Sequence, residues 1–382
     1  MKRTKTLYLL AGLALVVACI TSGWAFQRFH VPSYTPAVMT EFSKQMRTHC
    51  LGRFLIDVPA DLGVPSVSYA NFYFGLGSDF KQVEVQMPHT EDMSQEDFDR
   101  LVATRRGELQ NGRNAYIDAP MLLAERSIYT PTGDAVLFRR LYRDQGSVST
   151  IVSELHALVG GRYVILLSES FPPSDLGNEV ARTLYKLADP IVAENHLDMV
   201  ARHMRRAADA EHAGPGFCLN GVLFNQRDSG VDEEKASFDF NDTTTRQPKL
   251  SISMRGKFGY DKETLHQRVS RVLAFMSGLE DEGPIRKVRK GERTIAGMPF
   301  QEWAQEIYTN KYKTTQYSFF VQNLKPEPED KRFERPGTSI TLVSGADDYQ
   351  SSSPYSLPQL EQAWDLWLST FRLSPGNGGP HP

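Results

Sequence analysis

Histidine side chains with suitable spacing can ligate a metal, and the densest group in this chain of 382 residues is His196, His203 and His212. His196 and His203 are seven residues apart, close to two helical turns, so both imidazoles could share one face of a helix. Three arginines between residues 202 and 206 crowd the same segment, and their positive charge disfavours a bound cation. A solvated helix face is therefore the better interpretation of this group.

Other patterns that carry catalysis are missing from the sequence. It contains no G-x-S-x-G elbow, no H-E-x-x-H pair and no Walker loop. Gly75 and Gly77 form a fragment of a dinucleotide-binding fingerprint that lacks its third glycine. The acidic runs at 280–282 and 347–348 are flanked by Gly and Ser, which is typical of exposed loops. We therefore expect no catalytic residue, no metal and no cofactor, and hypothesise that the protein is not an enzyme.

Cys50 and Cys218 are the two cysteines outside the N-terminal segment, and neither has a companion motif that would make it a nucleophile. An oxidising compartment would permit a disulfide bond between them. Two separate buried thiols are the alternative. The distance decides between the two, because bridged cysteines have Cα atoms within about 7 Å.

The first thirty residues predict export from the cytoplasm. Lys2, Arg3 and Lys5 precede an uncharged apolar run at 7–26, and such a basic flank stays cytoplasmic while the rest of the chain moves outward. The run is close to the ~20 residues that span a bilayer as an uncleaved anchor. The residues before Cys19 also resemble a lipoprotein box, in which Cys19 would be lipidated. The apolar run continues past Cys19, which favours the anchor, and both alternatives place the body in the periplasm.

Composition and patterning predict two similar domains. The chain is 40% hydrophobic with a net charge of −3, which supplies two cores and gives no basic face for nucleic acid. Small and polar residues at 207–215 predict the boundary. The expected parts are a signal anchor or lipoprotein signal at 1–30, an N-terminal domain at 45–206 ending in a linking helix from 190, a C-terminal domain at 212–373, and a disordered tail at 374–382.

The two halves have similar elements in the same order. Each begins at a cysteine, continues into an alternating strand and a helix, forms further strands, and closes on a helix. We therefore predict a duplicated α+β unit, in which an antiparallel sheet is covered by helices on one face; chance similarity is the alternative. The paired segments are strands 81–87 and 249–254, helices from Ser94 and after Asp261, hairpins 122–142 and 291–308, and closing helices 175–188 and 356–371.

Clustered aromatic residues are the candidate anchors for a binding partner, since Tyr and Trp are enriched at interface hot spots. Packing in the protein's own core is the alternative for each of them. The candidates are Tyr69, Phe72, Tyr73, Phe74, Tyr308, Tyr312 and Tyr317.

One segment resembles a known family. Cys50, Gly52 and Arg53 begin a C-x-G-R-[FY]-x-[IVL]-[DE]-x-P pattern, and Phe217 begins an F-C-x-x-G pattern in the second half. In these motifs the chain resembles the type VI secretion immunity proteins that neutralise antibacterial lipase effectors of the fourth class. The resemblance extends over residues 45–373.

This resemblance implies a periplasmic antitoxin whose two domains grip a phospholipase effector and restrain its lid, with no chemistry required of the inhibitor. The expected partners are the effector and, through the N-terminal segment, the inner membrane, with no nucleic acid and no small-molecule substrate. No motif marks the effector-contacting residues. The alternatives are a non-catalytic envelope scaffold or chaperone and an uncharacterised hydrolase.

Deleting residues 1–26 tests the expectation of export. The truncated protein should remain in the cytoplasm, so it should no longer protect cells from a periplasmic lipase effector, while its affinity for that effector in vitro should be unchanged. Full protection by the cytoplasmic form would contradict the expected location.

Overall fold

The computed structural model describes residues 42, 45–75, 81–89, 91–114, 119–131, 133–142, 150–170, 189–211, 214–225, 230–241, 248–255, 263–276, 283–323, 336–345, 351–375 and 377. These residues belong to one compact unit, Phe42–Pro382. The N-terminal segment with Cys19 and the helix expected at 175–188 lie outside the described residues. Within the described ranges, no helix combines the length and the apolar character needed to cross a membrane.

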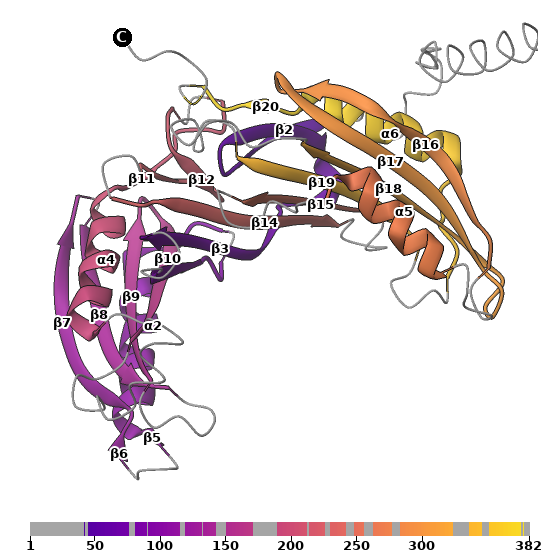
Figure 1. Cartoon of the computed structure of the whole chain (residues 1–382). Helices are drawn as coiled ribbons and strands as arrows, with labels where there is room; N and C mark the ends of the chain where they lie inside the picture. Colours follow the sequence, from indigo (N-terminus) through magenta and orange to yellow (C-terminus); the bar gives the residue numbers. More distant parts are fainter. Residues whose placement is uncertain are drawn as a thin grey trace, which may run out of the picture. The chain divides into compact units, whose positions relative to one another are not determined.

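Twelve antiparallel strands of the body form one sheet, in which both halves of the chain take part (Figure 1). Its strands in the N-terminal half are β3 (Ser66–Phe74), β4 (Lys81–Gln86), β7 (Leu122–Thr130), β8 (Gly133–Leu141), β9 (Ile151–Val159) and β10 (Arg162–Ser170). Those in the C-terminal half are β14 (Glu233–Asn241), β15 (Lys249–Arg255), β16 (Ile285–Ile295), β17 (Met298–Thr309), β18 (Thr314–Asn323) and β19 (Gly337–Ser344).

The two halves of the sheet have the same strand order. From the centre outward the N-terminal half reads β3-β4-β10-β9-β8-β7, and the C-terminal half reads β14-β15-β19-β18-β17-β16. They meet at β3 and β14, where Ala70 lies opposite Ala236. We expected two separate sheets, and the structure instead contains one, because β3 and β14 would each be an exposed edge strand if the halves were apart.

Short hairpins cross between the halves on one face of this sheet. Gly52 follows β1 with φ +55°, and its backbone exchanges hydrogen bonds of 2.7 and 2.8 Å with Cys218. The strand that ends each half pairs with the hairpin of the other half: β11 pairs with β13, and β20 pairs with β2. The short elements are β1 (Met46–Leu51), β2 (Phe54–Pro59), a 3-10 turn (Ala60–Leu62), β5 (Arg113–Asn114), β6 (Ala119–Pro120), β11 (Met204–Arg206), β12 (Phe217–Leu219), β13 (Val222–Phe224) and β20 (Arg372–Leu373).

The helices lie on both faces of the sheet, so the expectation of helices on one face is wrong. Helix α4 (Pro190–Arg202) packs in the main core that contains Val164, whereas α2 (Gln95–Asn111) packs in a separate cluster with Tyr163. Because successive residues of a strand point to opposite faces, the two helices cover opposite faces. The helix expected to link the domains from residue 190 to 206 is α4, which ends at Arg202 and packs on the sheet.

The C-terminal half repeats the arrangement with α5 (Leu265–Met276) and α6 (Leu357–Thr370). Gln301 accepts a hydrogen bond from the backbone of α5, while the neighbouring Glu302 accepts one from Trp364 of α6. Two predicted helix starts are confirmed: Ser94 caps α2, and Ser356 with Gln359 forms a capping box at α6.

A buried ion pair joins the two halves at their centre. Arg53, which is 1% exposed, donates to Glu234 of β14 at 2.9 and 2.5 Å. Arg53 also donates to the Asn377 side chain, which in turn bonds both backbone groups of Gly216. Asn377 is buried at 2% exposure, so the expected disordered tail is wrong at this residue.

Replacing Arg53 with Met should lower the free energy of unfolding by about 3–5 kcal/mol, because Glu234 would remain buried without its cationic partner. The double variant Arg53→Met with Glu234→Leu should recover much of this loss. Chemical denaturation of both proteins tests the expectation, and equal stability of the two variants would contradict it.

Candidate functional site

Two of the histidines singled out by their spacing, His196 and His203, make other contacts. His196 stacks on Phe74 with ring centroids 4.0 Å apart, and His203 bonds the Met199 carbonyl through Nδ1 at 2.7 Å. Burial, followed by the charge of Lys81, lowers the pKa of His196 to about 4. His196 is therefore a packing residue, and its expected place on a solvated face is wrong. In the described part of the chain no group of three His, Cys, Asp or Glu could hold a metal; His212 and the acidic runs at 280–282 and 347–348 lie outside it.

The arrangement closest to acid–base machinery is a buried group beneath α2. Glu154 accepts hydrogen bonds from Arg105 at 2.7 and 3.0 Å, is bonded to His156 at 3.1 Å, and pairs with Arg140. His156 is also bonded to the Tyr163 hydroxyl. Burial alone would raise the pKa of Glu154, but the bonds from His156 and Arg105 outweigh it and hold the pKa well below the usual range. Glu154, His156 and Tyr163 are buried, whereas the Arg105 side chain is 28% exposed. The Arg105–Glu154 pair holds α2 on the sheet.

The face of the sheet opposite to the hairpins, α4 and α6 is polar across both halves, and we call it the shared face. Its residues alternate with a fully buried apolar row that includes Phe72, Phe238, Ile252 and Ile340. Strand pairing places its members side by side from β4 to β18: Tyr69, Asn71, Tyr73, Gln82, Glu84, Lys235, Ser237, Ser253, Arg255, Phe320, Gln322, Ser339 and Thr341.

The shared face carries charges of both signs. Glu84 and Glu169 are close enough that burial and then the charge of Glu84 raise the pKa of Glu169. Across the β3–β14 junction, Lys235 lies beside Arg255. Burial and the nearby Glu233 raise the pKa of Tyr73 to about 12. Acidic residues are present in both halves of this face, because Glu233 and Asp239 lie on the same side of β14 as Lys235.

The predicted aromatic anchors divide between the two faces. Phe72 and Phe74 belong to the main core, whereas Tyr69 lies on the shared face with the Lys235 ammonium group 5.1 Å from its ring centroid. Such a contact presents a rigid aromatic surface beside a charge, as interface hot spots do. Elsewhere, Tyr312 is 39% exposed at the turn between β17 and β18. From the sequence, core aromatics were not distinguished from surface aromatics in this segment. Their alternation along β3 distinguishes them, because Phe72 and Phe74 point to one face and Tyr69 and Tyr73 to the other.

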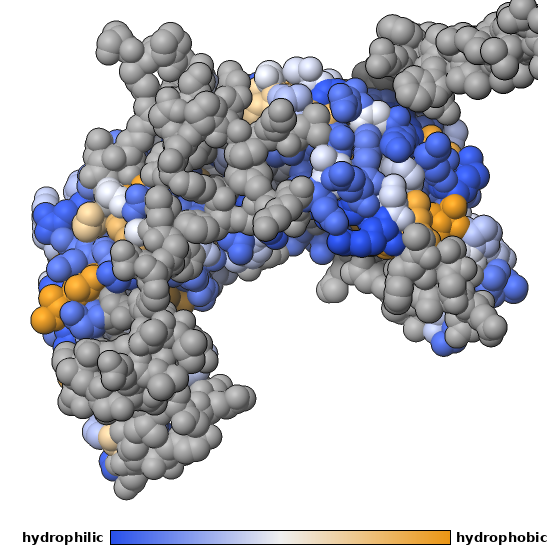
Figure 2. Space-filling model, viewed as in Figure 1, coloured by the Kyte–Doolittle hydropathy of each residue, from blue (hydrophilic) through white to orange (hydrophobic). Residues whose placement is uncertain are grey.

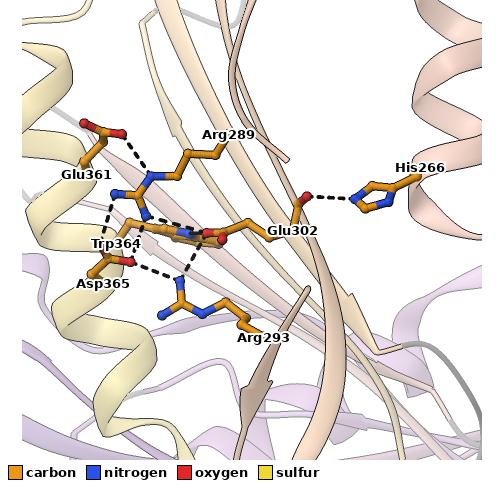
Figure 3. A network of polar contacts seen from close by, with 7 residues as sticks. All are labelled: His266, Arg289, Arg293, Glu302, Glu361, Trp364 and Asp365. Carbon is orange, nitrogen blue, oxygen red and sulfur yellow. Dashed lines mark hydrogen bonds and ion pairs between the residues drawn. The ribbon is translucent and has the colours of Figure 1, made fainter. Parts of the chain in front are cut away.

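The opposite face is occupied by the protein's own helices. Figure 3 shows Arg289 and Arg293 of β16 bonded to Asp365 of α6 at 2.9–3.0 Å, with Glu302 and Glu361 completing the network. Burial alone would lower the pKa of Arg289, but Asp365 and then Glu361 outweigh it and raise the pKa.

The N-terminal half has a corresponding contact on this opposite face. There Glu194 of α4 pairs with Arg126 at 3.0 Å and with Arg139 at 2.6 Å. These ion pairs hold α4 and α6 against the sheet.

Cys50 and Cys218 lie in the hairpins that cross between the halves. Their Cα atoms are 5.7 Å apart, inside the range that a bridge requires, and the structure joins them by a disulfide bond. Each is the cysteine that opens its half, so the bond connects equivalent positions across 168 residues of sequence.

Comparison with known families assigns both halves. Residues 47–176 match the Tle cognate immunity protein 4 N-terminal domain, and residues 212–376 match the Tle cognate immunity protein 4 C-terminal domain. The chain belongs to this immunity protein family. These matches confirm the resemblance to type VI secretion immunity proteins that the motifs at Cys50 and Phe217 indicated.

Solved structures share this fold. One is the apo immunity protein TplEi of the T6SS from Pseudomonas aeruginosa, at 17% identity and a TM-score of 0.58 over 87% of this chain and 98% of that one. Another is the Tle4–Tli4 complex, at 17% identity and a TM-score of 0.56 over 86% and 98%. TplEi complexed with "L" peptide gives 16% identity and a TM-score of 0.54 over 87% and 99%. No curated protein sequence matches the chain.

We expect Cys50 and Cys218 to resist alkylation in the non-reduced protein, and reduction to lower the free energy of unfolding by about 2–4 kcal/mol, since a long loop would be released. Mass spectrometry of alkylated protein and denaturation with and without reductant test this. The Cys19→Ser variant is the matched control and should be as stable as wild type. Two thiols that alkylate readily without reductant would contradict the bridge.

Proposed function

We propose that this member of the Tle cognate immunity protein 4 family binds a type VI secreted phospholipase effector and inhibits it through a grip by both halves. The observation that carries the proposal is that the two family domains share one sheet, whose shared face extends across both. A partner that docks on this face would contact both halves at once. The Tle4–Tli4 complex, which has the same fold, is consistent with such a partner.

Inhibition of this kind needs binding energy and no reaction by the inhibitor. A lipase whose lid must open over a membrane is inactive while its closed state is held, and a ligand shifts such an equilibrium only by its preference for one state. Moving a population from 1:99 to 99:1 takes a preference of about 10⁴-fold. A rigid sheet surface contributes to the affinity, because little conformational entropy is lost on binding.

The proposed place of action is the periplasm. The basic residues near the N-terminus and the apolar run at 7–26 support export, with the body held at the inner membrane by an anchor or by lipid on Cys19. Immunity would then act where the effector reaches its membrane substrate.

Co-expression of the cognate phospholipase effector, directed to the periplasm, tests the function. Cells that also express this protein should survive, and cells without it should lyse. Equal killing in both cultures would overturn the proposal.

The double variant Tyr69→Ala with Lys235→Glu tests the grip. It removes an aromatic surface and reverses a charge at the centre of the shared face, so we expect the effector to bind at least about tenfold more weakly. Titration calorimetry measures this. The matched control is Ile191→Ser on α4, a residue 66% exposed on the opposite side, which should bind as wild type does. Weaker effector binding in the Ile191→Ser control alone would place the interface on the α4 side of the sheet and contradict the grip.

A further inference from the structure

The C-terminal half contains a polar cavity of about 280 Å³ between α5 and strands β15, β18 and β19. Two guanidinium groups line it, Arg255 from the end of β15 and Arg268 from α5. Its other polar lining includes Ser253, Gln322, Ser339 and Thr341. Among the described residues that line the cavity none is acidic, so its wall carries donors and positive charge.

The corresponding place in the N-terminal half is apolar. Helices α2 and α5 align on their first turns, where Ser94 caps α2 and Thr264 exchanges bonds with Gln267 at α5. In this alignment Arg268 stands where α2 has Phe98, which is 3% exposed in an apolar cluster. The same fold thus buries an aromatic ring in one half and places a charged group over a polar cavity in the other.

A second difference follows one turn later in the same alignment. Val102 of α2 is 3% exposed, whereas Val272 of α5 is 53% exposed. Val272 lies four residues after Arg268, so both are on one side of the helix. Figure 2 shows a strongly hydrophilic surface in the region of α5 with a hydrophobic patch beside it. This combination of a charge and an apolar surface is typical of a protein interface.

The positive charges at the cavity influence one another. Arg268 donates to the side chain of Gln322, a neutral acceptor. Burial, followed by the charges of Arg255 and Arg271, lowers the pKa of Arg268. Arg271 itself pairs with Glu263 at 2.8 Å and does not line the cavity. An anion in the cavity would offset the repulsion between Arg255 and Arg268.

We propose that Arg255 and Arg268 form a socket for a carboxylate side chain of the effector, an inference that rests on the proposed immunity function. Guanidinium groups bind carboxylates through paired, charge-assisted hydrogen bonds. The volume is just below that of ligand pockets, which start at roughly 300 Å³, so it suits one side chain better than a whole lipid. The socket also belongs to the shared face, where Lys235 lies beside Arg255 and extends the same positive region.

The test uses the full chain with the purified cognate effector. Arg268→Met and Arg255→Met retain aliphatic length and remove one charge each, and each should weaken binding about 30-fold. The matched control is Arg202→Met on α4, where the side chain is 60% exposed and pairs with Asp198. Its affinity should equal that of wild type. Thermal unfolding of each variant establishes that the fold is intact.

The outcomes separate the inference from the function on which it rests. If wild type binds the effector and the two socket variants bind equally well, the socket is wrong and the immunity function stands. If wild type does not bind, both are overturned. Vesicles of phosphatidylglycerol provide the remaining arm: loss of vesicle binding in the socket variants, with unchanged effector affinity, would assign the cavity to a lipid headgroup instead.

Discussion

The antiparallel pairing of β3 with β14 is the contact on which the rest of this structure depends. Seven register pairs, from Ser66–Asp239 to Tyr73–Glu233, turn two copies of one strand order into a single sheet. The Arg53–Glu234 ion pair and the crossing hairpins reinforce the same junction from one side. Because backbone hydrogen bonds run through the junction, the two halves form one surface and not two domains joined by a linker.

This junction also divides the sheet into two chemically different faces. On one side the hairpins, α4 and α6 bury a continuous apolar core, and the ion pairs of Glu194 and Asp365 hold the closing helices in place. On the other side α2 packs against β7 and β9, and α5 packs against β17. Of the polar residues of the central strands on this side, Tyr69 and Lys235 are partly exposed and Arg255 is exposed, whereas Asn71, Tyr73 and Ser237 are buried. A binding protein gains from this division, since its stability and its recognition are placed on different faces.

Much of the local structure could be predicted from the sequence. Alternation at 81–87 and 249–254 and the helix starts at Ser94 and Ser356 correspond to observed elements. These features depend on residues close together in the chain. Pairing of β3 with β14 joins residues more than 150 positions apart, and no local pattern distinguishes it from two separate sheets. The same limit explains the error about the helices, because covering one face or both depends on long-range packing.

The candidate site was less accessible to sequence reasoning. Tyr69 was identified as an aromatic anchor, but Lys235, Arg255 and Arg268 belong to no motif and come together only through strand pairing and the docking of α5. A comparison of the two halves does contain a signal, because Arg268 replaces the apolar Phe98 at an equivalent helical position. This difference becomes visible only when α2 and α5 are aligned on their first turns at Ser94 and Thr264.

The central claim is that one partner covers the shared face in both halves at once, and hydroxyl-radical footprinting of the effector complex tests it most directly. Oxidation of Tyr69 in the N-terminal half and of Phe320 in the C-terminal half should both fall when the effector binds, while oxidation of Ile191 on the opposite side should not change. Protection of one half alone, or of Ile191 in place of the shared face, would contradict the account.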